Sequence, residues 1–165
     1  MSKQDRNALV ALPIVVIIAA VFAAAGSQGG SAVGGLPVFA LCVLLAFVIQ
    51  WVVFVPSYLL QTERFFDLTG GLTYITVAVV AVVLSDAPDA RAWLLAGMVA
   101  LWAARLSSFL FLRIRRAGAD TRFDAIKPSF PRFLNTWTLQ GLWVTVTASA
   151  ALAAITSTTR VELGT

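Results

Sequence analysis

Five long runs of apolar residues, separated by polar or glycine-rich segments, divide the chain. A helix needs about 20 mostly apolar residues to cross the hydrocarbon core of a bilayer. The pattern therefore predicts five transmembrane helices, with spans at residues 8–25, 36–60, 68–84, 92–112 and 137–156. The expected fold class is all-α, a polytopic membrane helical bundle, with residues 1–165 forming a single membrane domain.

The connections between the spans differ in character. The stretch 26–35 contains five glycines and two serines and is predicted to be a short flexible turn. The connections at 61–67 and 85–91 are short and polar. Residues 113–136 form the one long connection, which is predicted to be a loop rich in basic residues.

Basic residues are distributed unevenly about these spans. With the N-terminus inside, two of the twelve, Arg91 and Arg160, fall outside, and Arg105 lies within a span and is not counted. Nine fall inside. Because positively charged loops are retained in the cytoplasm, this count predicts a cytoplasmic N-terminus. The expected location is the inner (plasma) membrane, as a multi-pass protein. The nine residues are Lys3, Arg6, Arg64, Arg113, Arg115, Arg116, Arg122, Lys127 and Arg132.

The first span has a second interpretation. A basic start, an apolar run and the small residues at 23–27 are also typical of a cleaved signal peptide. The run of 18 residues exceeds the 7–15 residues of a typical signal-peptide core, which favours a retained helix. Removal of the segment would leave the orientation of the other four spans unchanged.

Composition supports the membrane class. Apolar residues make up 59% of the chain and charged residues 12%, and the mean hydropathy is +0.88. A soluble fold of this size would expose much of that apolar surface, so the expected surroundings are a lipid bilayer. The net charge is +4, but the basic residues lie where membrane topology requires them, which argues against nucleic-acid binding.

The absence of histidine and the single cysteine limit the chemistry that the chain can perform. The sequence has no histidine, which excludes Ser-His-Asp and Cys-His catalysis and the usual imidazole metal sites within it, and no metal site is predicted. The one cysteine, Cys42, lies inside an apolar run. It cannot form an intramolecular disulfide and is interpreted as a small buried apolar residue.

The first candidate site lies where the third span begins. Spacings of three, four and seven residues place on one helical face Asp67, Gly70, Gly71 and Tyr74. A carboxylate near paired glycines and a phenol is suited to a polar pocket, because glycine lets a helix or a ligand approach the backbone closely. The alternative is that Glu63, Arg64 and Asp67 form an interfacial cap and the glycines serve helix packing.

The second candidate is a basic stripe from the fourth span into the long loop. Arg105 lies eight residues before Arg113, about 12 Å deeper in the membrane at 1.5 Å per residue. A charge at that depth costs at least a few kcal/mol, and we predict that Arg105 pairs with Asp67 or Glu63. Arg105 and Arg116 share a helical face, which is suited to a phosphate or a polar cofactor. Alternatively, the loop arginines determine topology and meet anionic lipid.

The third candidate lies in the long loop, where acidic and basic side chains alternate at Asp120, Arg122 and Asp124. Such a cluster can bind a ribose or a phosphate, and it can equally form a solvated turn and a helix cap.

Together these stretches resemble the bacterial steroid 5-alpha-reductase-like membrane family, also called domain of unknown function 1295. The resemblance covers about residues 61–163. Similar proteins have an aspartate before a glycine-containing helix, a Trp-x-x-Arg-Leu segment, an acid-x-Arg-aromatic loop and a Leu-Gln-Gly span. The matching segments here are 64–71, 101–106, 113–123 and 133–141.

The resemblance implies an NADPH-dependent reductase of carbon–carbon double bonds in a lipid or steroid-like substrate. In such proteins, protein groups polarise a conjugated carbonyl and the nicotinamide delivers hydride. The resemblance places at the catalytic, substrate-facing end Asp67, Tyr74 and Glu63. It assigns to cofactor binding Arg105, Arg113, Arg116, Asp120 and Arg122.

One departure from the family pattern bears on activity. Members continue with further spans and an Arg-His-Pro-Asn-Tyr stretch of the cofactor site, whereas this sequence has no histidine. The resemblance therefore covers the N-terminal and middle portions, and residues 156–165 resemble the start of the missing part. We expect a fragment, half of a split protein that a partner chain completes, or a degenerate member. The alternative is a non-catalytic membrane scaffold or interaction subunit.

Overall fold

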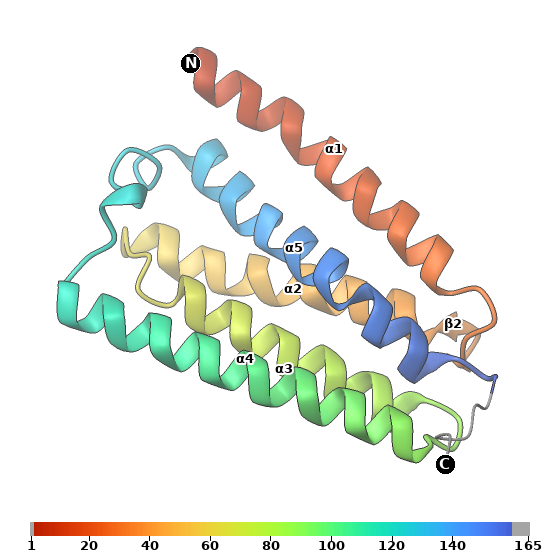
Figure 1. The fold of residues 1–165 in the computed structure, drawn as a ribbon. Helices are drawn as coiled ribbons and strands as arrows, with labels where there is room; N and C mark the ends of the chain where they lie inside the picture. The colour runs from red at the N-terminus through yellow and green to blue at the C-terminus, as the bar shows by residue number, and fades with distance from the viewer. Residues whose placement is uncertain (1, 160–165) are drawn as a thin grey trace.

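The computed structural model describes residues 2–159, and these form a bundle of five long helices (Figure 1). The helices are α1 (Lys3–Gly26), α2 (Val38–Leu59), α3 (Phe66–Leu84), α4 (Ala90–Ala117) and α5 (Phe130–Thr156). All five are long and apolar enough to cross a membrane. The prediction of an all-α, multi-pass membrane bundle is therefore confirmed.

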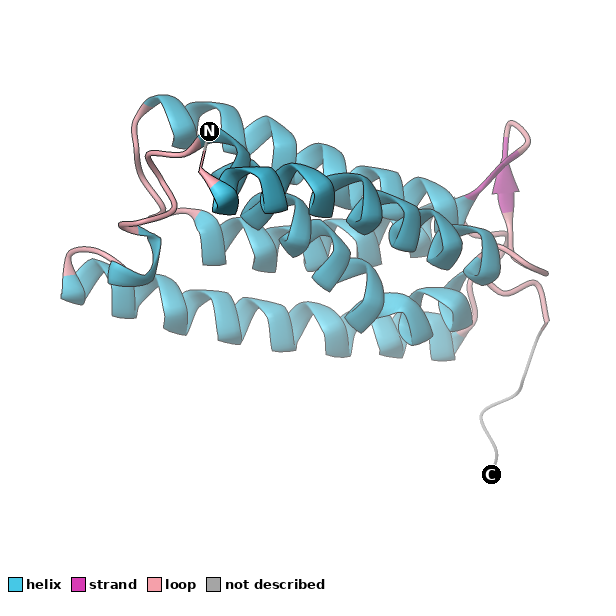
Figure 2. Cartoon of the chain, turned by 90° about the horizontal axis from the view of Figure 1, so that it is seen from above, coloured by secondary structure: helices cyan, strands magenta, loops and turns pink. Residues whose placement is uncertain are grey.

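The connection between α1 and α2 is a small hairpin at one end of the bundle (Figure 2). Strands β1 (Ala32–Val33) and β2 (Leu36–Pro37) pair in antiparallel fashion. The two residues between them, Gly34 and Gly35, have φ angles of 58° and 82°. A two-residue hairpin turn of this kind needs positive φ at both positions, which glycine adopts without steric cost. The turn predicted as flexible therefore has a defined geometry.

Helix α5 is the centre of the bundle, because it packs against each of the other four helices. Helix α1 packs mainly on α5 and touches α2 only lightly, while α3 and α4 pack against each other along their length. At the start of both helices, the Ser129 hydroxyl donates to Asp5 Oδ1 at 2.6 Å and Arg132 donates to Gln4 Oε1 at 2.7 Å. These bonds hold α1 on the far side of α5 from α4 (Figure 1).

The seam between α2, α3 and α5 combines close backbone contact with buried polar bonds. A Cβ atom at Gly141 would lie 3.2 Å from Cγ of Phe47, so the glycine brings α5 against α2. The fully buried Gln50 donates from Nε2 to the Thr73 hydroxyl at 2.8 Å, joining α2 to α3. In a bilayer such bonds and small residues hold helices together. Cys42 is fully buried in this core, as predicted.

The irregular segment between α4 and α5 is shorter than the predicted loop at 113–136. Helix α4 continues to Ala117, because its arginines favour helix, and it ends at Gly118, whose φ is 85°. Helix α5 begins at Phe130 with a proline in its first turn, a favourable position for that residue. The connection at 118–129 contains a single 3-10 turn, η1 (Thr121–Phe123).

The nine basic residues that were predicted to be cytoplasmic all lie at one end of the bundle. This end carries the described N-terminus, the connection from α2 to α3 and the connection from α4 to α5 (Figure 1). Arg91 lies at the other end, while Arg160 and the rest of 160–165 lie outside the described residues. The geometry is consistent with the positive-inside count, and the orientation in the membrane stays a prediction.

Candidate functional site

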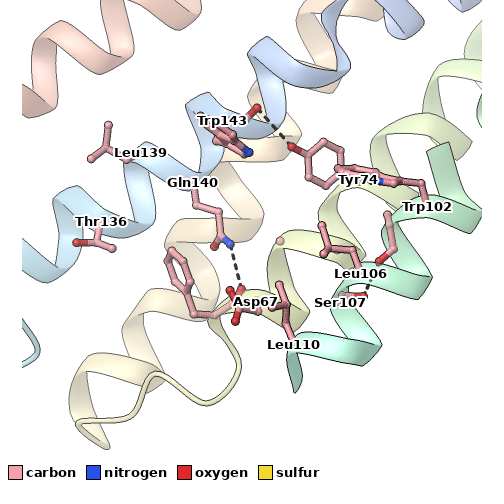
Figure 3. Close-up of a pocket in the computed structure, with 14 residues that line it drawn as sticks. Asp67, Tyr74, Trp102, Leu106, Ser107, Leu110, Thr136, Leu139, Gln140 and Trp143 are labelled. Carbon is pink, nitrogen blue, oxygen red and sulfur yellow. Dashed lines mark hydrogen bonds between the residues drawn. The ribbon is translucent and has the colours of Figure 1, made fainter. Parts of the chain in front are cut away.

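A cavity of about 540 Å³ lies between α3, α4 and α5 (Figure 3). Its lining comes from one face of each helix, at spacings of three and four residues. Helix α3 contributes Phe66, Asp67, Gly70, Gly71 and Tyr74. Helix α4 contributes Trp102, Ala103, Leu106, Ser107 and Leu110. Helix α5 contributes Thr136, Leu139, Gln140 and Trp143.

The paired glycines of α3 bring the other two helices close. A Cβ atom at Gly71 would lie 2.3 Å from Cβ of Ser107, so α4 rests against the α3 backbone. A Cβ atom at Gly70 would lie 2.5 Å from Nε2 of Gln140 on α5. The prediction of close approach at these glycines is confirmed. It is helix packing that uses them, which was the alternative interpretation.

Tyr74 lines the cavity with its ring rather than with its hydroxyl group. The phenol oxygen is hydrogen-bonded to the hydroxyl of Thr147, with the Trp143 carbonyl 3.4 Å away. Because Thr147 donates its own hydrogen to the Trp143 carbonyl, the phenol donates to Thr147. Trp102 meets the Tyr74 ring edge-on at 5.1 Å between centroids. Tyr74 therefore ties α3 to α5 and presents an aromatic wall.

Asp67 is the acidic residue that lines the cavity. It lies near Leu110 and Gln140, at the end away from Tyr74 (Figure 3). Within residues 2–159 its carboxylate has no hydrogen bond or ion pair. Arg113 and Arg122 are close enough to act on it electrostatically, but neither lines this cavity. Asp67 is thus a half-buried carboxylate whose oxygens are available to a ligand.

Glu63 lies outside the cavity and holds the connection at 118–129 in place. Its side chain is buried, with Oε2 2.6 Å from Nζ of Lys127 and Oε1 accepting from the Asp120 N–H at 2.9 Å. Burial disfavours the carboxylate, but these hydrogen bonds outweigh it and keep the pKa of Glu63 below its ordinary value. The hydrogen bond from Lys127 to Glu63 also raises the pKa of Lys127. The Lys127 Nζ atom lies 3.4 Å from Oδ1 of Asp124 as well.

The predicted ion pair of Arg105 with Asp67 or Glu63 is wrong. Arg105 is exposed and has no ion pair with any residue that the structure describes. Helix α4 turns Ala103 and Ser107 toward α3. Arg105 lies two residues from each of them, and at 100° per residue this places it about 160–200° around the helix, on the opposite face. Arg105 therefore faces the surroundings of the bundle, on the side away from the cavity.

The other predicted cofactor residues gather beyond the Asp67 end of the cavity. Two shallow grooves adjoin at Arg113, one shared with Arg116 and the other with Asp120 and Arg122. The Asp120 carboxylate accepts from Arg122 Nε at 2.9 Å, and this bond lowers the pKa of Asp120 and raises that of Arg122. The guanidinium groups suit an anionic ligand such as a phosphate.

Several lining residues had no role assigned from the sequence. Trp102, Thr136 and Gln140 lie within segments that resemble the family, whereas Ser107 and Trp143 lie outside them. Helical spacing could have found them, because residues three or four positions apart share one face of a helix. Ser107 shares a face of α4 with Ala103, and Thr136 and Trp143 share a face of α5 with Gln140. Which face turns toward α3 was not readable from spacing alone.

The cavity opens sideways between α4 and α5. The aromatic side chains on its two edges are 46% exposed at Trp102 and 67% at Trp143, and two leucines, Leu106 and Leu139, are also exposed beside them. Its inner face, at Gly70, Gly71 and Ser107, is buried. In a bilayer this opening faces lipid. The fold and the site thus define a polytopic helical membrane protein with a laterally open cavity.

A family model described as "Protein of unknown function (DUF1295)" matches residues 51–164. The match covers more than two thirds of the chain, which belongs to this family, as the resemblance predicted. All three helices of the cavity lie inside the matched region, while α1 and the first half of α2 precede it. Searches of curated proteins and of solved structures found no significant match.

Proposed function

We propose that the chain forms the substrate-binding cavity of a reductase-like membrane protein. In this proposal an apolar, lipid-like molecule enters the cavity between α3, α4 and α5 with its polar end toward Asp67. The observation that carries the proposal is that three segments of family resemblance, from three helices, line one cavity. They supply Asp67 and the glycines of α3, Trp102 and Leu106 of α4, and Gln140 of α5.

The size and lining of the cavity support a lipid-like ligand. Its volume of about 540 Å³ falls within the range of small-molecule pockets, and such pockets are mostly apolar with a few polar groups. The opening between α4 and α5 lets a molecule dissolved in the bilayer enter without crossing water. In the bound state Tyr74 and Trp102 would contact the apolar body, and Asp67 would orient the polar end.

The basic residues near Asp67 support a place for NADPH. Arg113, Arg116 and Arg122 would hold its phosphate groups, and Glu63 would act indirectly by positioning the loop that carries Arg122. When bound, NADPH supplies the hydride for reduction of a carbon–carbon double bond. Arg105 shares a helical face with Arg116 but lines neither groove, and it has no part in this proposal.

Photolabelling tests the binding site. The protein in lipid nanodiscs is labelled with a diazirine-bearing sterol, with and without an excess of unlabelled sterol, and the adducts are mapped by mass spectrometry. We expect the competitor to suppress labelling at Leu106, Leu110 and Leu139. Labelling at the exposed Ile14 and Ile17 of α1 is the control, since lipid contact there is not saturable. Equal suppression on both surfaces, or on neither, would overturn the proposal.

A thermal-shift measurement tests the cofactor separately. NADPH should raise the unfolding temperature of the protein, and Arg113→Ala or Arg122→Ala should reduce that increase, because a ligand that binds the folded state stabilises it. The exposed Arg115, which lies over the Phe111 ring and lines neither groove, provides the control variant Arg115→Ala. No shift in any variant would remove NADPH from the proposal and leave a lipid-binding or scaffold protein.

A further inference from the structure

We propose that the outer face of α4 binds a phospholipid with an anionic headgroup, from the leaflet at the basic end of the bundle. This inference concerns a surface outside the cavity and does not depend on the proposed function. It is carried by Arg105, a charged residue within a span that lines no cavity and has no ion pair among the residues that the structure describes.

Helix α4 lies at the edge of the bundle and leaves one side uncovered (Figure 1). It packs along α3 and, less extensively, against α5. On the side opposite α3, four exposed residues fall within an arc of about 60° at 100° per residue. These residues are Arg105, Phe109, Leu112 and Arg116. A basic residue therefore lies at each end of an apolar, lipid-facing stripe.

The positive charge of α4 has few partners within the protein. The helix contains five arginines and no acidic residue. Arg91 lies beside Asp89, whereas the other four have no ion pair within residues 2–159. Arg115 and Arg116 lie in the last turn, where the helix C-terminus favours a cation. Arg105 lies about three turns earlier, where an uncompensated charge in lipid is costly, so an anion from the surroundings would stabilise it.

Two arginines of this face can approach one anion. Arg105 and Arg116 are about 16 Å apart along the helix axis. Helical side chains lean toward the N-terminus, so that of Arg116 leans toward Arg105. Arg105 extends the other way when it reaches for the membrane interface, as long basic side chains do. Both guanidinium groups can then meet a single phosphate at the level of Phe109 and Leu112.

A groove of about 450 Å³ lies at this level of α4. Its lining consists of Phe109, Leu112, Arg113, Arg116 and Ala117. Guanidinium groups match the geometry of a phosphate, and basic pockets at the membrane interface bind anionic headgroups. The exposed apolar side chains below the arginines provide contact for an acyl chain, which a soluble phosphate lacks. The lining therefore favours a phospholipid over a free phosphate.

Ser108 offers a further donor beside Arg105. It is exposed, and its hydroxyl has no hydrogen bond within residues 2–159. The neighbouring Ser107 instead donates to the Ala103 carbonyl at 2.7 Å, a common bond for serine in apolar helices. A serine hydroxyl left unbonded toward lipid is available to a phosphate or ester oxygen of the same molecule.

Native mass spectrometry with two matched lipids tests the site. Phosphatidylglycerol and phosphatidylcholine with the same acyl chains are titrated into the detergent-solubilised protein, and the lipid molecules bound to each chain are counted. Because only phosphatidylglycerol carries a net negative charge, we expect its first molecule to bind about tenfold more tightly. Equal affinity for the two lipids would overturn the inference.

A pair of variants locates the binding on α4. Arg105→Gln removes the charge, so the affinity for phosphatidylglycerol should fall about fivefold, while that for phosphatidylcholine should change little. Arg105 is chosen because it lines neither groove assigned to NADPH. The control Arg115→Gln removes the same charge from a residue that lies over Phe111, about 100° around the helix from Arg116. It should bind phosphatidylglycerol as wild type does. Equal losses in both variants would indicate a response to net charge alone and would contradict a site.

A thermal-shift measurement separates lipid from other anions. Phosphatidylglycerol should raise the unfolding temperature of wild type more than that of Arg105→Gln, and inorganic phosphate should raise neither. An equal rise with inorganic phosphate would identify a general anion site and overturn the inference. A protein dimer that forms without phosphatidylglycerol and dissociates in Arg105→Gln would overturn it too, because another helix would then cover this face.

Discussion

Glu63 lies four residues before Asp67, one just ahead of α3 and the other in its first turn, yet their surroundings differ. Glu63 is 2% exposed, and its carboxylate meets Lys127 and the Asp120 N–H. Asp67 lines an apolar cavity and has no hydrogen-bond partner within residues 2–159. The difference shows that the Glu63 carboxylate is engaged in bonds within the protein, while the Asp67 carboxylate is free to bind a ligand.

The backbone explains why two nearby acids separate in this way. Glu63 precedes the helix, in the turn after α2, where its side chain reaches the connection at 118–129. Asp67 lies in the first turn of α3, where the helix dipole favours a negative charge and where the helical face turns to α4 and α5. Measurements that treat the two acids as a pair test this division.

The largest effect is expected at Glu63. Glu63→Gln removes the charge that compensates Lys127, whose side chain is 15% exposed, and breaking a buried ion pair in this way costs about 3 kcal/mol. We expect a loss of that size in the free energy of unfolding, measured by denaturant titration in detergent micelles. The double variant Glu63→Gln/Lys127→Met should recover part of it.

The pH dependence gives an independent check on Glu63. Its folded-state pKa is lowered, so its stabilisation is full above the ordinary value of 4.5 and is lost as the pH falls through the folded-state pKa. The stability difference between wild type and Glu63→Gln should therefore shrink on acidification. The stability difference should persist at alkaline pH, because the raised pKa of Lys127 keeps its ammonium group charged there. A difference independent of pH would contradict the ion-pair account.

The frame of the cavity should be the next most sensitive feature. Gly71→Ala places a methyl group against Cβ of Ser107, which only a shift of α4 can relieve, at a cost of about 1–3 kcal/mol. Gly70→Ala meets the movable amide of Gln140 and gains helix propensity, so we expect its unfolding free energy within about 0.5 kcal/mol of wild type. Equal destabilisation in both variants would show that α4 does not rest on α3 at Gly71.

The smallest effect on stability is expected at Asp67 itself. Asp67→Asn removes no hydrogen bond or ion pair within the described residues, so the free energy of unfolding should change by no more than about 0.5 kcal/mol. The same unfolding titration as for Glu63→Gln measures it. A loss comparable to that of Glu63→Gln would show that Asp67 is also a structural acid and would remove the contrast.

Much of the architecture was readable from the sequence, because hydropathy and helical spacing are local properties. The five apolar runs became the five helices, and the spacing of Asp67, Gly70, Gly71 and Tyr74 did bring these residues to one cavity. The helix ends were less readable. Arginines extend α4 beyond its apolar run, because they favour helix regardless of the solvent around them.

The partners of the charged and polar groups were decided by tertiary structure. The sequence offered Arg105 as the partner of Glu63, and the fold supplied Lys127, 64 residues away. It turned Arg105 outward and directed the phenol of Tyr74 to α5.

By itself, then, the sequence determined the membrane class, the five spans and the shared face of α3, since each depends on neighbours along the chain. The tertiary structure decided which acid is paired, which is open, and which faces of α4 and α5 complete the cavity. Those outcomes depend on how each helix is rotated about its axis, and that rotation is set by packing between helices distant in sequence.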